Sequence, residues 1–251
     1  MTAGTGRSPA LPFDRTAVDA VSLDVGGVLV VPDHGILAHA LATAGVAFDR
    51  SRFGDGHYSA MAAVDRARSR PEDLTDYAHA FARAVGVAGD QIEEAAVTLA
   101  AVLAAPVWHQ PLAGARAALA RLAAAGVRLA VTSNSDGSVA DMLARYEILQ
   151  VGDGRGLAVE HISDSGVVGV HKPDAALFRA TADGLGLPVG RVCHVGDAGG
   201  FDADGAAAAG MLAVHVDPLA LCPDDHVHVA SLADFVDRLL GPAPVLGAGS
   251  D

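Results

Sequence analysis

Five polar side chains stand where structured segments of the sequence begin or end, and together they could perform nucleophilic chemistry. Asp24 follows a run rich in Val and Leu, Ser133 ends a second apolar run, and Asp197 follows a third. Lys172 opens a helical pattern, and Asp202 comes shortly after Asp197. Because ligands bind beyond the carboxyl ends of the strands in an open parallel sheet, we expect these side chains to meet at one edge.

This set of groups suits the transfer of a phosphoryl group. The Asp24 carboxylate can attack phosphorus and form an aspartyl-phosphate. Since two anions repel, a hard cation is needed, and Mg²⁺ prefers carboxylates together with substrate oxygens. Asp24 and Asp197 are the expected metal ligands, with Asp202 binding directly or through water. The Ser133 hydroxyl and backbone N–H groups can hold phosphate oxygens, while Lys172 offsets the charge of the transition state.

Taken one at a time, these residues have ordinary structural interpretations. An Asp at a strand end is usually a turn or cap residue, Ser133-Asn134 reads as a turn, and a lone Lys before Pro usually lies on the surface. The hypothesis of a site depends on the fact that these residues occur together at equivalent positions. Four such positions fall at equivalent points of one predicted sheet.

Strand and helix patterns alternate along most of the chain. Apolar runs typical of buried strands occupy residues 18–23, 127–131, 157–162, 191–195 and 211–216. Helical patterns separate most of these runs, at residues 111–125, 136–146, 174–185 and 202–209. A last helix is expected at 232–240 after Ser231, a residue type that favours the N-cap. The alternation predicts an α/β protein with a Rossmann-like, mostly parallel sheet between helices.

One segment interrupts the alternation directly after the first strand. Residues 33–108 show no convincing strand but four helical patterns, at 36–44, 52–68, 74–85 and 91–104. We therefore predict a helical domain at 33–108, inserted into a core of residues 16–32 and 109–240. The ends, 1–15 and 241–251, are rich in Gly, Pro and Ser and are expected to be flexible tails.

The composition restricts the partners and the compartment. The chain has 30 acidic and 17 basic residues, a net charge of −13. This charge argues against nucleic acid or a membrane surface as a partner, because both require a basic face. Two cysteines, Cys193 and Cys222, argue against a disulfide framework. The longest apolar run, at 95–108, is shorter than the ~18 residues typical of a membrane span. We expect a soluble, cytoplasmic protein of undetermined oligomeric state.

The chain resembles the haloacid dehalogenase-like superfamily in four ordered motifs, Asp24, Ser133, Lys172 and Gly196-Asp197-x-x-x-x-Asp202. The resemblance spans about residues 18 to 240. It implies a core of five parallel strands, a nucleophile at Asp24, and a helical cap at 33–108 that closes over the site. It also implies a magnesium contact from the backbone carbonyl of Gly26. The expected substrate contacts come from Gly26, Gly27, Ser133, Asn134 and Lys172.

The sequence departs from the family pattern at Gly26. Many phosphatases of the family carry a second Asp at this position, two residues after the nucleophile, as the general acid and base. Its loss typically costs about 10²–10⁴-fold in rate. The hypothesis is therefore a substrate with a good leaving group, such as an anomeric sugar phosphate or an acyl phosphate.

Three functions remain open, and a phosphatase acting on a small phosphorylated metabolite is favoured. A metal-independent dehalogenase would use the same nucleophile on carbon. Dehalogenases of the superfamily carry a bulky aromatic residue in place of Gly26 and an Arg shortly after the strand, whereas residues 28–31 contain no Arg. A binding protein that retains the fold without activity is the third alternative, and Gly26 is its best argument.

Several other residues carry weaker signals. His226 and His228 alternate along the chain and His215 is near them in sequence, so a zinc site is conceivable. Without a Cys or a spaced acid to complete it, surface histidines are the expected interpretation. His34, just past the first strand, could face the substrate or lie in an exposed loop. Trp108 is expected to anchor the hinge of the insertion by packing.

Overall fold

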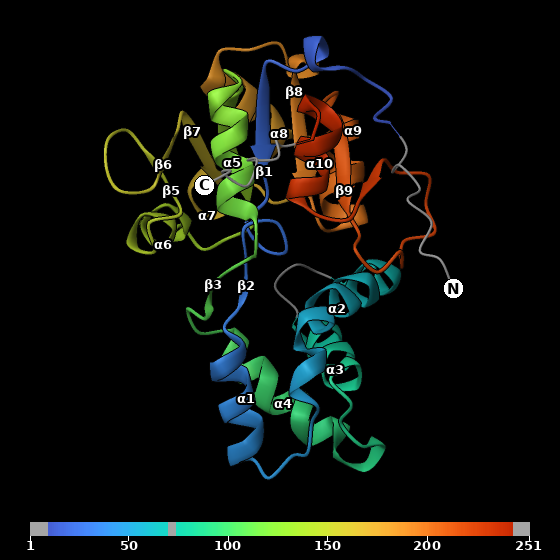
Figure 1. The fold of residues 1–251 in the computed structure, drawn as a ribbon. Helices are drawn as coiled ribbons and strands as arrows, with labels where there is room; N and C mark the ends of the chain where they lie inside the picture. The colour runs from blue at the N-terminus through green and yellow to red at the C-terminus, as the bar shows by residue number, and fades with distance from the viewer. Residues whose placement is uncertain (1–9, 70–73, 243–251) are drawn as a thin grey trace, which may run out of the picture.

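The structure is a computed structural model that describes residues 10–69 and 74–242. Most of the tails predicted at 1–15 and 241–251 lie outside these residues. The described chain divides into a core with a central sheet and a group of helices beneath it (Figure 1). We keep the name cap for residues 33–108.

The central sheet of the described chain has six parallel strands in the order β10-β9-β8-β1-β4-β7. The strands are β1 (Ala20–Leu23), β4 (Arg128–Ser133), β7 (His161–Asp164), β8 (Val192–Gly196), β9 (Leu212–Val216) and β10 (His228–Val229). The mostly parallel α/β sheet is confirmed, but the resemblance implied five strands. The sixth, β10, is an edge strand of two residues, too short to show an alternating pattern.

Two apolar layers cover the two faces of the sheet. On one face, Leu119 and Phe235 pack with Val21 of β1. On the other face, Phe178 packs with Ala20, because successive side chains of a strand point to opposite sides. The covering helices are α5 (Ala115–Ala124) and α10 (Leu232–Leu240) on the first face, and α8 (Ala175–Leu185) and α9 (Gly205–Ala209) on the second.

Smaller elements complete the core. The run predicted as one strand at 157–162 is divided, since β6 (Leu157–Val159) pairs with β5 (Leu149–Val151) in a separate sheet and only β7 joins the central one. In the described part of the core, the connections contain the helices α6 (Val139–Arg145) and α7 (Ser165–Val168), two 3-10 turns (Arg15–Ala17 and Val189–Arg191) and the π-helix η5 (Gly199–Asp204). Ser231 caps α10 as expected, accepting a hydrogen bond from the Asp234 N–H.

The cap has its own apolar core. Its helices are α1 (His34–Thr43), α2 (Phe53–Ala67), α3 (Thr75–Ala84) and α4 (Ile92–Leu103). Phe53, Phe81 and Leu99 are fully buried among them. An antiparallel ribbon of β2 (Val30–Pro32) and β3 (Trp108–Pro111) joins cap and core. Helix α2 lies against the core (Figure 1), which places it over the carboxyl ends of the strands.

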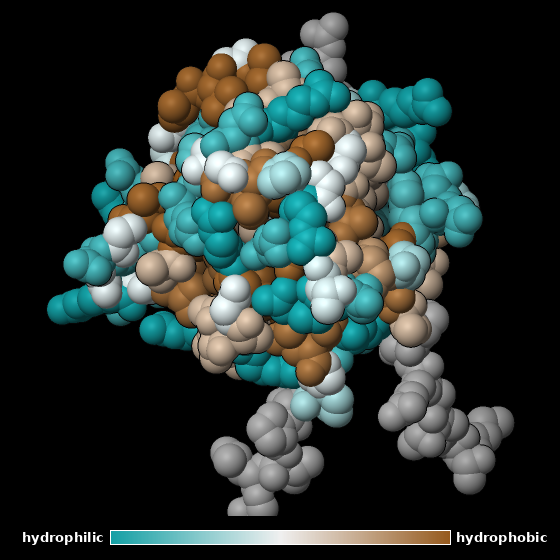
Figure 2. All heavy atoms as spheres, turned by 90° about the horizontal axis from the view of Figure 1, so that it is seen from above, coloured by the Kyte–Doolittle hydropathy of each residue, from teal (hydrophilic) through white to brown (hydrophobic). Residues whose placement is uncertain are grey.

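The surface carries both kinds of side chain. On the face of the core remote from the cap, hydrophilic and hydrophobic residues are interspersed (Figure 2). Within the described ranges, none of the helices combines the length and hydropathy needed to cross a bilayer.

Candidate active site

The sheet order brings the predicted residues together. Strand β1 lies between β4 and β8, so their carboxyl ends are adjacent. Asp24 follows β1, Ser133 ends β4, and Asp197 follows β8. The loop before α8 adds Lys172, and the π-helix η5 adds Asp202. All five line one cavity of about 610 Å³ between core and cap.

Lys172 links two of the acids. Its Nζ lies 2.6 Å from Asp24 Oδ1 and 2.6 Å from Asp202 Oδ1, and its side chain is 3% exposed. Burial by itself would lower the pKa of the ammonium, but Asp202 and Asp24 outweigh that effect and raise it. Lys172 is therefore a fixed positive charge beside the nucleophile candidate.

The two acids bonded to Lys172 differ in their proton affinity. Burial raises the pKa of Asp24 to about 7, with Asp202 and Asp197 adding to the rise and Lys172 opposing it. For Asp202, burial acts in the same sense, but Lys172 and His194 together hold its pKa below the ordinary value. His194 is buried and donates from Nε2 to Asp202 Oδ1 at 2.9 Å. Asp202 is therefore held in its ionised form by hydrogen bonds, whereas Asp24 binds a proton more readily.

The acids also form a group suited to a hard cation. Asp24, Asp197 and Asp202 each offer an oxygen, and these oxygens lie within 4.8 Å of one another. Lys172 pairs with Asp24 and Asp202, while Asp197 bonds to His57. After burial, which is the largest cause, the charges of Asp202 and Asp197 also raise the pKa of Asp24. Oxygen donors of this kind fit Mg²⁺. Gly26, whose carbonyl the resemblance adds, lines the same cavity.

Asn134 fixes the loop that carries Lys172. Its Oδ1 accepts from the Lys172 N–H at 2.8 Å, and its Nδ2 donates to the Lys172 carbonyl at 3.3 Å. Asp164, at the end of β7, in turn accepts from the N–H groups of Gly137 and Val139. The predicted substrate contact of Asn134 stays a prediction, while the structure gives this side chain a positioning contact.

The two glycines after the nucleophile meet different constraints. Gly27 has φ +63°, and a Cβ there would lie 2.2 Å from Asp197 Oδ2. A Cβ on Gly26 would meet nothing closer than Trp108, at 3.5 Å. Gly27 is thus required by space and backbone conformation. At Gly26 the indole of Trp108 stands beside the position that carries the acid and base in many phosphatases.

Helix α2 supplies contacts that the sequence did not indicate. His57 donates from Nε2 to Asp197 Oδ2 at 2.7 Å and accepts at Nδ1 from the Tyr77 hydroxyl at 2.8 Å. The Tyr58 hydroxyl donates to the Gly27 carbonyl at 2.9 Å. Asp65 accepts from the N–H groups of Gly199 and Gly200 at 2.7 and 3.1 Å. The sequence pattern predicted a helix that contains His57, Tyr58 and Asp65, but it could not predict their partners, which lie in the core.

The cavity has one charged wall and one apolar wall. The core supplies the acids, Lys172 and Ser133, while Met61, Leu103 and Trp108 of the cap lie opposite. Trp108 also packs against the ring of His57, with centroids 5.8 Å apart. This contact places Trp108 at the junction of the cap and the joining ribbon, where a packing anchor was expected.

The four histidines that the sequence singled out do not line this cavity. His34 packs edge-on against Phe53, and its N–H donates to Gln110. The expectation of surface residues for His215, His226 and His228 was wrong, because His215 is buried and the other two are partly buried. Their rings contact one another because β9 and β10 pair side by side, which places His215 opposite His228, and His226 lies just before β10.

Comparison with known proteins gives a consistent assignment. The sequence profile of haloacid dehalogenase-like hydrolases matches residues 18–210. A haloacid dehalogenase (HAD) family hydrolase from Deinococcus radiodurans, solved with phosphate and sodium, is 24% identical and has a TM-score of 0.56, over 90% of this chain and 99% of that one. No curated protein matches the sequence.

Two further structures show the same fold at lower identity. A HAD phosphatase from Thermococcus onnurineus is 17% identical with a TM-score of 0.54, over 90% of this chain and 99% of that one. A 2-haloacid dehalogenase from Pseudomonas syringae pv. Tomato is 20% identical with a TM-score of 0.50, over 88% and 97%. The same architecture therefore occurs in a phosphatase and in a dehalogenase.

Proposed function

Since this chain belongs to the haloacid dehalogenase-like hydrolase family, we propose that it is a Mg²⁺-dependent phosphatase of a small phosphorylated metabolite. The observation that carries the proposal is the cluster of Asp24, Asp197 and Asp202, in which Lys172 pairs with Asp24 and Asp202. Gathering three carboxylates, two of them buried, beside one ammonium is costly unless a cation completes the site. A phosphatase has use for that cation, because its substrate brings further negative charge.

The reaction divides into two displacements at phosphorus. Asp24 attacks, the bond from phosphorus to the leaving oxygen breaks, and an aspartyl-phosphate forms. Water then attacks the phosphorus, and phosphate leaves with Asp24 restored. Lys172 balances the charge on the phosphoryl oxygens, and the Ser133 hydroxyl with neighbouring N–H groups orients them. Mg²⁺, held by Asp24, Asp197, Asp202 and the Gly26 carbonyl, would neutralise the repulsion between nucleophile and phosphate.

The surroundings of Gly26 restrict the substrate. The acid that usually protonates the leaving group is missing, and Trp108 lies beside its place. Leaving groups that need little protonation are therefore favoured, among them anomeric sugar phosphates and acyl phosphates. The apolar side chains of the cap wall would contact the non-phosphate part of the substrate.

A dehalogenase is the second candidate, and the apolar cap wall favours it. A carbon–halogen substrate would sit against Trp108 with its carbon facing Asp24. Asp24 would displace halide, and water would hydrolyse the resulting ester. The cluster with Asp197 weighs against this alternative, because displacement of halide from carbon calls for no divalent cation.

The test measures hydrolysis of an aryl phosphate with Mg²⁺ and after chelation, in wild type and Asp24→Asn. We expect activity that requires Mg²⁺ and falls to background in the variant. Asp183→Asn, which changes an exposed acid on α8, should behave as wild type. Halide release from 2-haloacids without metal would instead identify a dehalogenase. A folded protein inactive on both substrate classes would leave the binding protein.

A further inference from the structure

A second group of side chains that could hold a metal ion lies beyond Asp197, on the side away from Lys172. It consists of His215 on β9, Cys222 and His226 on the following loop, and His228 on β10. We call these four residues the histidine–cysteine cluster. Each offers one nitrogen or sulfur atom, and the four atoms lie within 4.8 Å of one another.

Two nitrogens of the cluster are buried without a partner. His215 Nδ1 and His228 Nε2 have no hydrogen-bond partner among the described residues. Buried polar atoms nearly always have a partner, so each such atom requires an explanation. The rings of His215 and His228 lie 5.2 Å apart between centroids. A cation bound between the rings would satisfy both nitrogens at once.

The opposite nitrogens are already engaged in the manner of metal-bound imidazoles. His215 Nε2 lies 3.0 Å from the carbonyl of Asp197, and His226 Nε2 lies 3.1 Å from Asp204 Oδ1. A histidine that binds metal through one nitrogen commonly donates its other N–H to a carbonyl or carboxylate. This leaves Nδ1 of both rings for the ion. His226 Nδ1 is 3.5 Å from Cys222 Sγ, so the thiol faces the same point.

We propose that the histidine–cysteine cluster binds one Zn²⁺ ion. Three imidazoles and one thiolate are donors that zinc accepts in four-coordinate sites, whereas Mg²⁺ and Ca²⁺ select oxygen. Tetrahedral zinc with bonds of about 2.0–2.3 Å places its ligand atoms roughly 3.3–3.8 Å apart. A contraction of the cluster by about an ångström suffices. Binding releases the Cys222 thiol proton to solvent.

The position of the cluster gives the ion a structural role. It would tie the loop bearing Cys222 and His226 to strands β9 and β10. Through His215 it would also hold the carbonyl of Asp197, next to the proposed magnesium site. All four positions are filled by protein, which is typical of structural rather than catalytic zinc.

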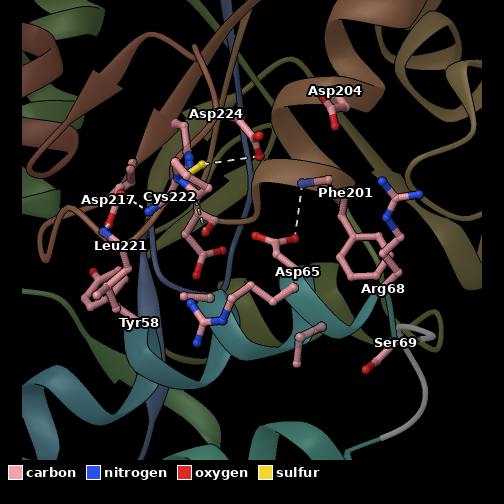
Figure 3. Close-up of a pocket in the computed structure, with 18 of the residues that line it drawn as sticks. Tyr58, Asp65, Arg68, Ser69, Phe201, Asp204, Asp217, Leu221, Cys222 and Asp224 are labelled. Carbon is pink, nitrogen blue, oxygen red and sulfur yellow. Dashed lines mark hydrogen bonds between the residues drawn. The ribbon is translucent and has the colours of Figure 1, made fainter.

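A neighbouring cavity of about 700 Å³ provides access. His215 and Cys222 line it together with Asp65, Asp204 and Asp217. Cys222 lies on one side of this cavity, beside Asp224, and Asp65 of α2 lies across from it (Figure 3). Carboxylates along this path favour the approach of a divalent cation.

The test determines the metal content of the full chain, purified with zinc in the medium and dialysed without chelator. We expect about one zinc per chain in wild type and Asp24→Asn, and less than about a tenth in Cys222→Ser and His226→Gln. His39→Ala removes an exposed imidazole on α1 and should keep the zinc. Because the readout is metal content, it is independent of phosphatase activity.

A second measurement identifies the ligands in folded protein. Cobalt in place of zinc should give the visible absorption of a tetrahedral site and a thiolate-to-cobalt charge-transfer band. Cys193→Ala leaves Cys222 as the remaining thiol and should keep that band, while Cys222→Ser should abolish it. The proposal is overturned if folded wild type retains no zinc. It is equally overturned if Cys222→Ser retains zinc fully, or if Asp24→Asn alone loses it.

Discussion

His57 Nε2 lies 2.7 Å from Asp197 Oδ2, a contact between residues 140 positions apart that joins cap and core. Both side chains are at least 97% buried. The Tyr77 hydroxyl donates to Nδ1, the other nitrogen of the imidazole, so the ring has a defined orientation. A cap residue therefore fixes one oxygen of a proposed magnesium ligand, which couples docking of the cap to the state of the metal site.

We predict that His57→Ala weakens magnesium binding. Loss of a hydrogen bond that orients a metal ligand commonly costs about 10–100-fold in metal affinity or activity. The Mg²⁺ concentration for half-maximal hydrolysis should rise by that order. Tyr77→Phe, which removes only the hydroxyl behind the ring, should shift it in the same direction by less. An unchanged Mg²⁺ requirement with a reduced kcat would contradict this role for His57.

A second prediction concerns the missing acid. Gly26→Asp restores a carboxyl group at the usual position, and its Cβ would meet Trp108 at an ordinary 3.5 Å. The variant should hydrolyse alkyl phosphates faster, by up to about 10²-fold, while aryl phosphates change little. Gly26→Asn, of similar size but without the titrating group, is the control. If wild type already prefers simple alkyl phosphates over aryl phosphates, the hypothesis of a good leaving group is wrong.

The sequence predicted the elements well because their patterns are local. The helix at 232–240 has the predicted bounds, and each cap helix begins and ends within two residues of its prediction. The convergence of Asp24, Ser133 and Asp197 followed from topology, since carboxyl ends of parallel strands share an edge.

What the sequence could not give depends on contacts between distant segments. No local pattern marks His57, because its partner Asp197 is brought to it only when the cap docks. The zinc interpretation of His215 was set aside for lack of a fourth ligand. The expectation that no cysteine completes the set was wrong, because Cys222 stands only four residues before His226 and lies within 4.8 Å of the three histidine nitrogens. Strand β10 also depends on a contact, because its two residues are too few to show an alternating pattern and it is defined by its pairing with β9.

A third prediction concerns Gly27, where backbone strain from a positive φ and a steric clash with Asp197 can be distinguished. Gly27→Ala should lower the free energy of unfolding by about 1–3 kcal/mol, since φ +63° is unfavourable for Ala. It should also abolish hydrolysis, because its Cβ would displace the Asp197 carboxylate. Gly45→Ala is the matched control, having φ +72° with nothing within 4 Å of the added Cβ. Denaturant unfolding should show a larger loss in Gly27→Ala than in Gly45→Ala, because displacing Asp197 also breaks its buried hydrogen bond to His57. Activity should be kept only in Gly45→Ala.

The last prediction concerns the pH dependence of stability through His161 on β7. Burial lowers the pKa of this imidazole from its ordinary 6.5. Below pH 6.5 the unfolded chain therefore binds the proton more readily than the folded one. The contribution to stability is complete above pH 6.5 and declines as the pH falls toward the folded-state pKa. His161→Gln should make the decline of the unfolding free energy below pH 6.5 shallower than in wild type.

A histidine whose pKa is shifted in the opposite direction provides the control. The hydrogen bond to Glu93 raises the pKa of His79 above 6.5, so its stabilising effect is present below that pH and lost above it. His79→Gln removes a contribution that builds up as the pH falls toward 6.5 and is constant below it, so the slope of the unfolding free energy should change above pH 6.5 and match wild type below it. Denaturant unfolding at several pH values on either side of 6.5 measures all three slopes. Equal slopes in wild type and His161→Gln would mean that the folded chain protonates this ring as readily as the unfolded chain does.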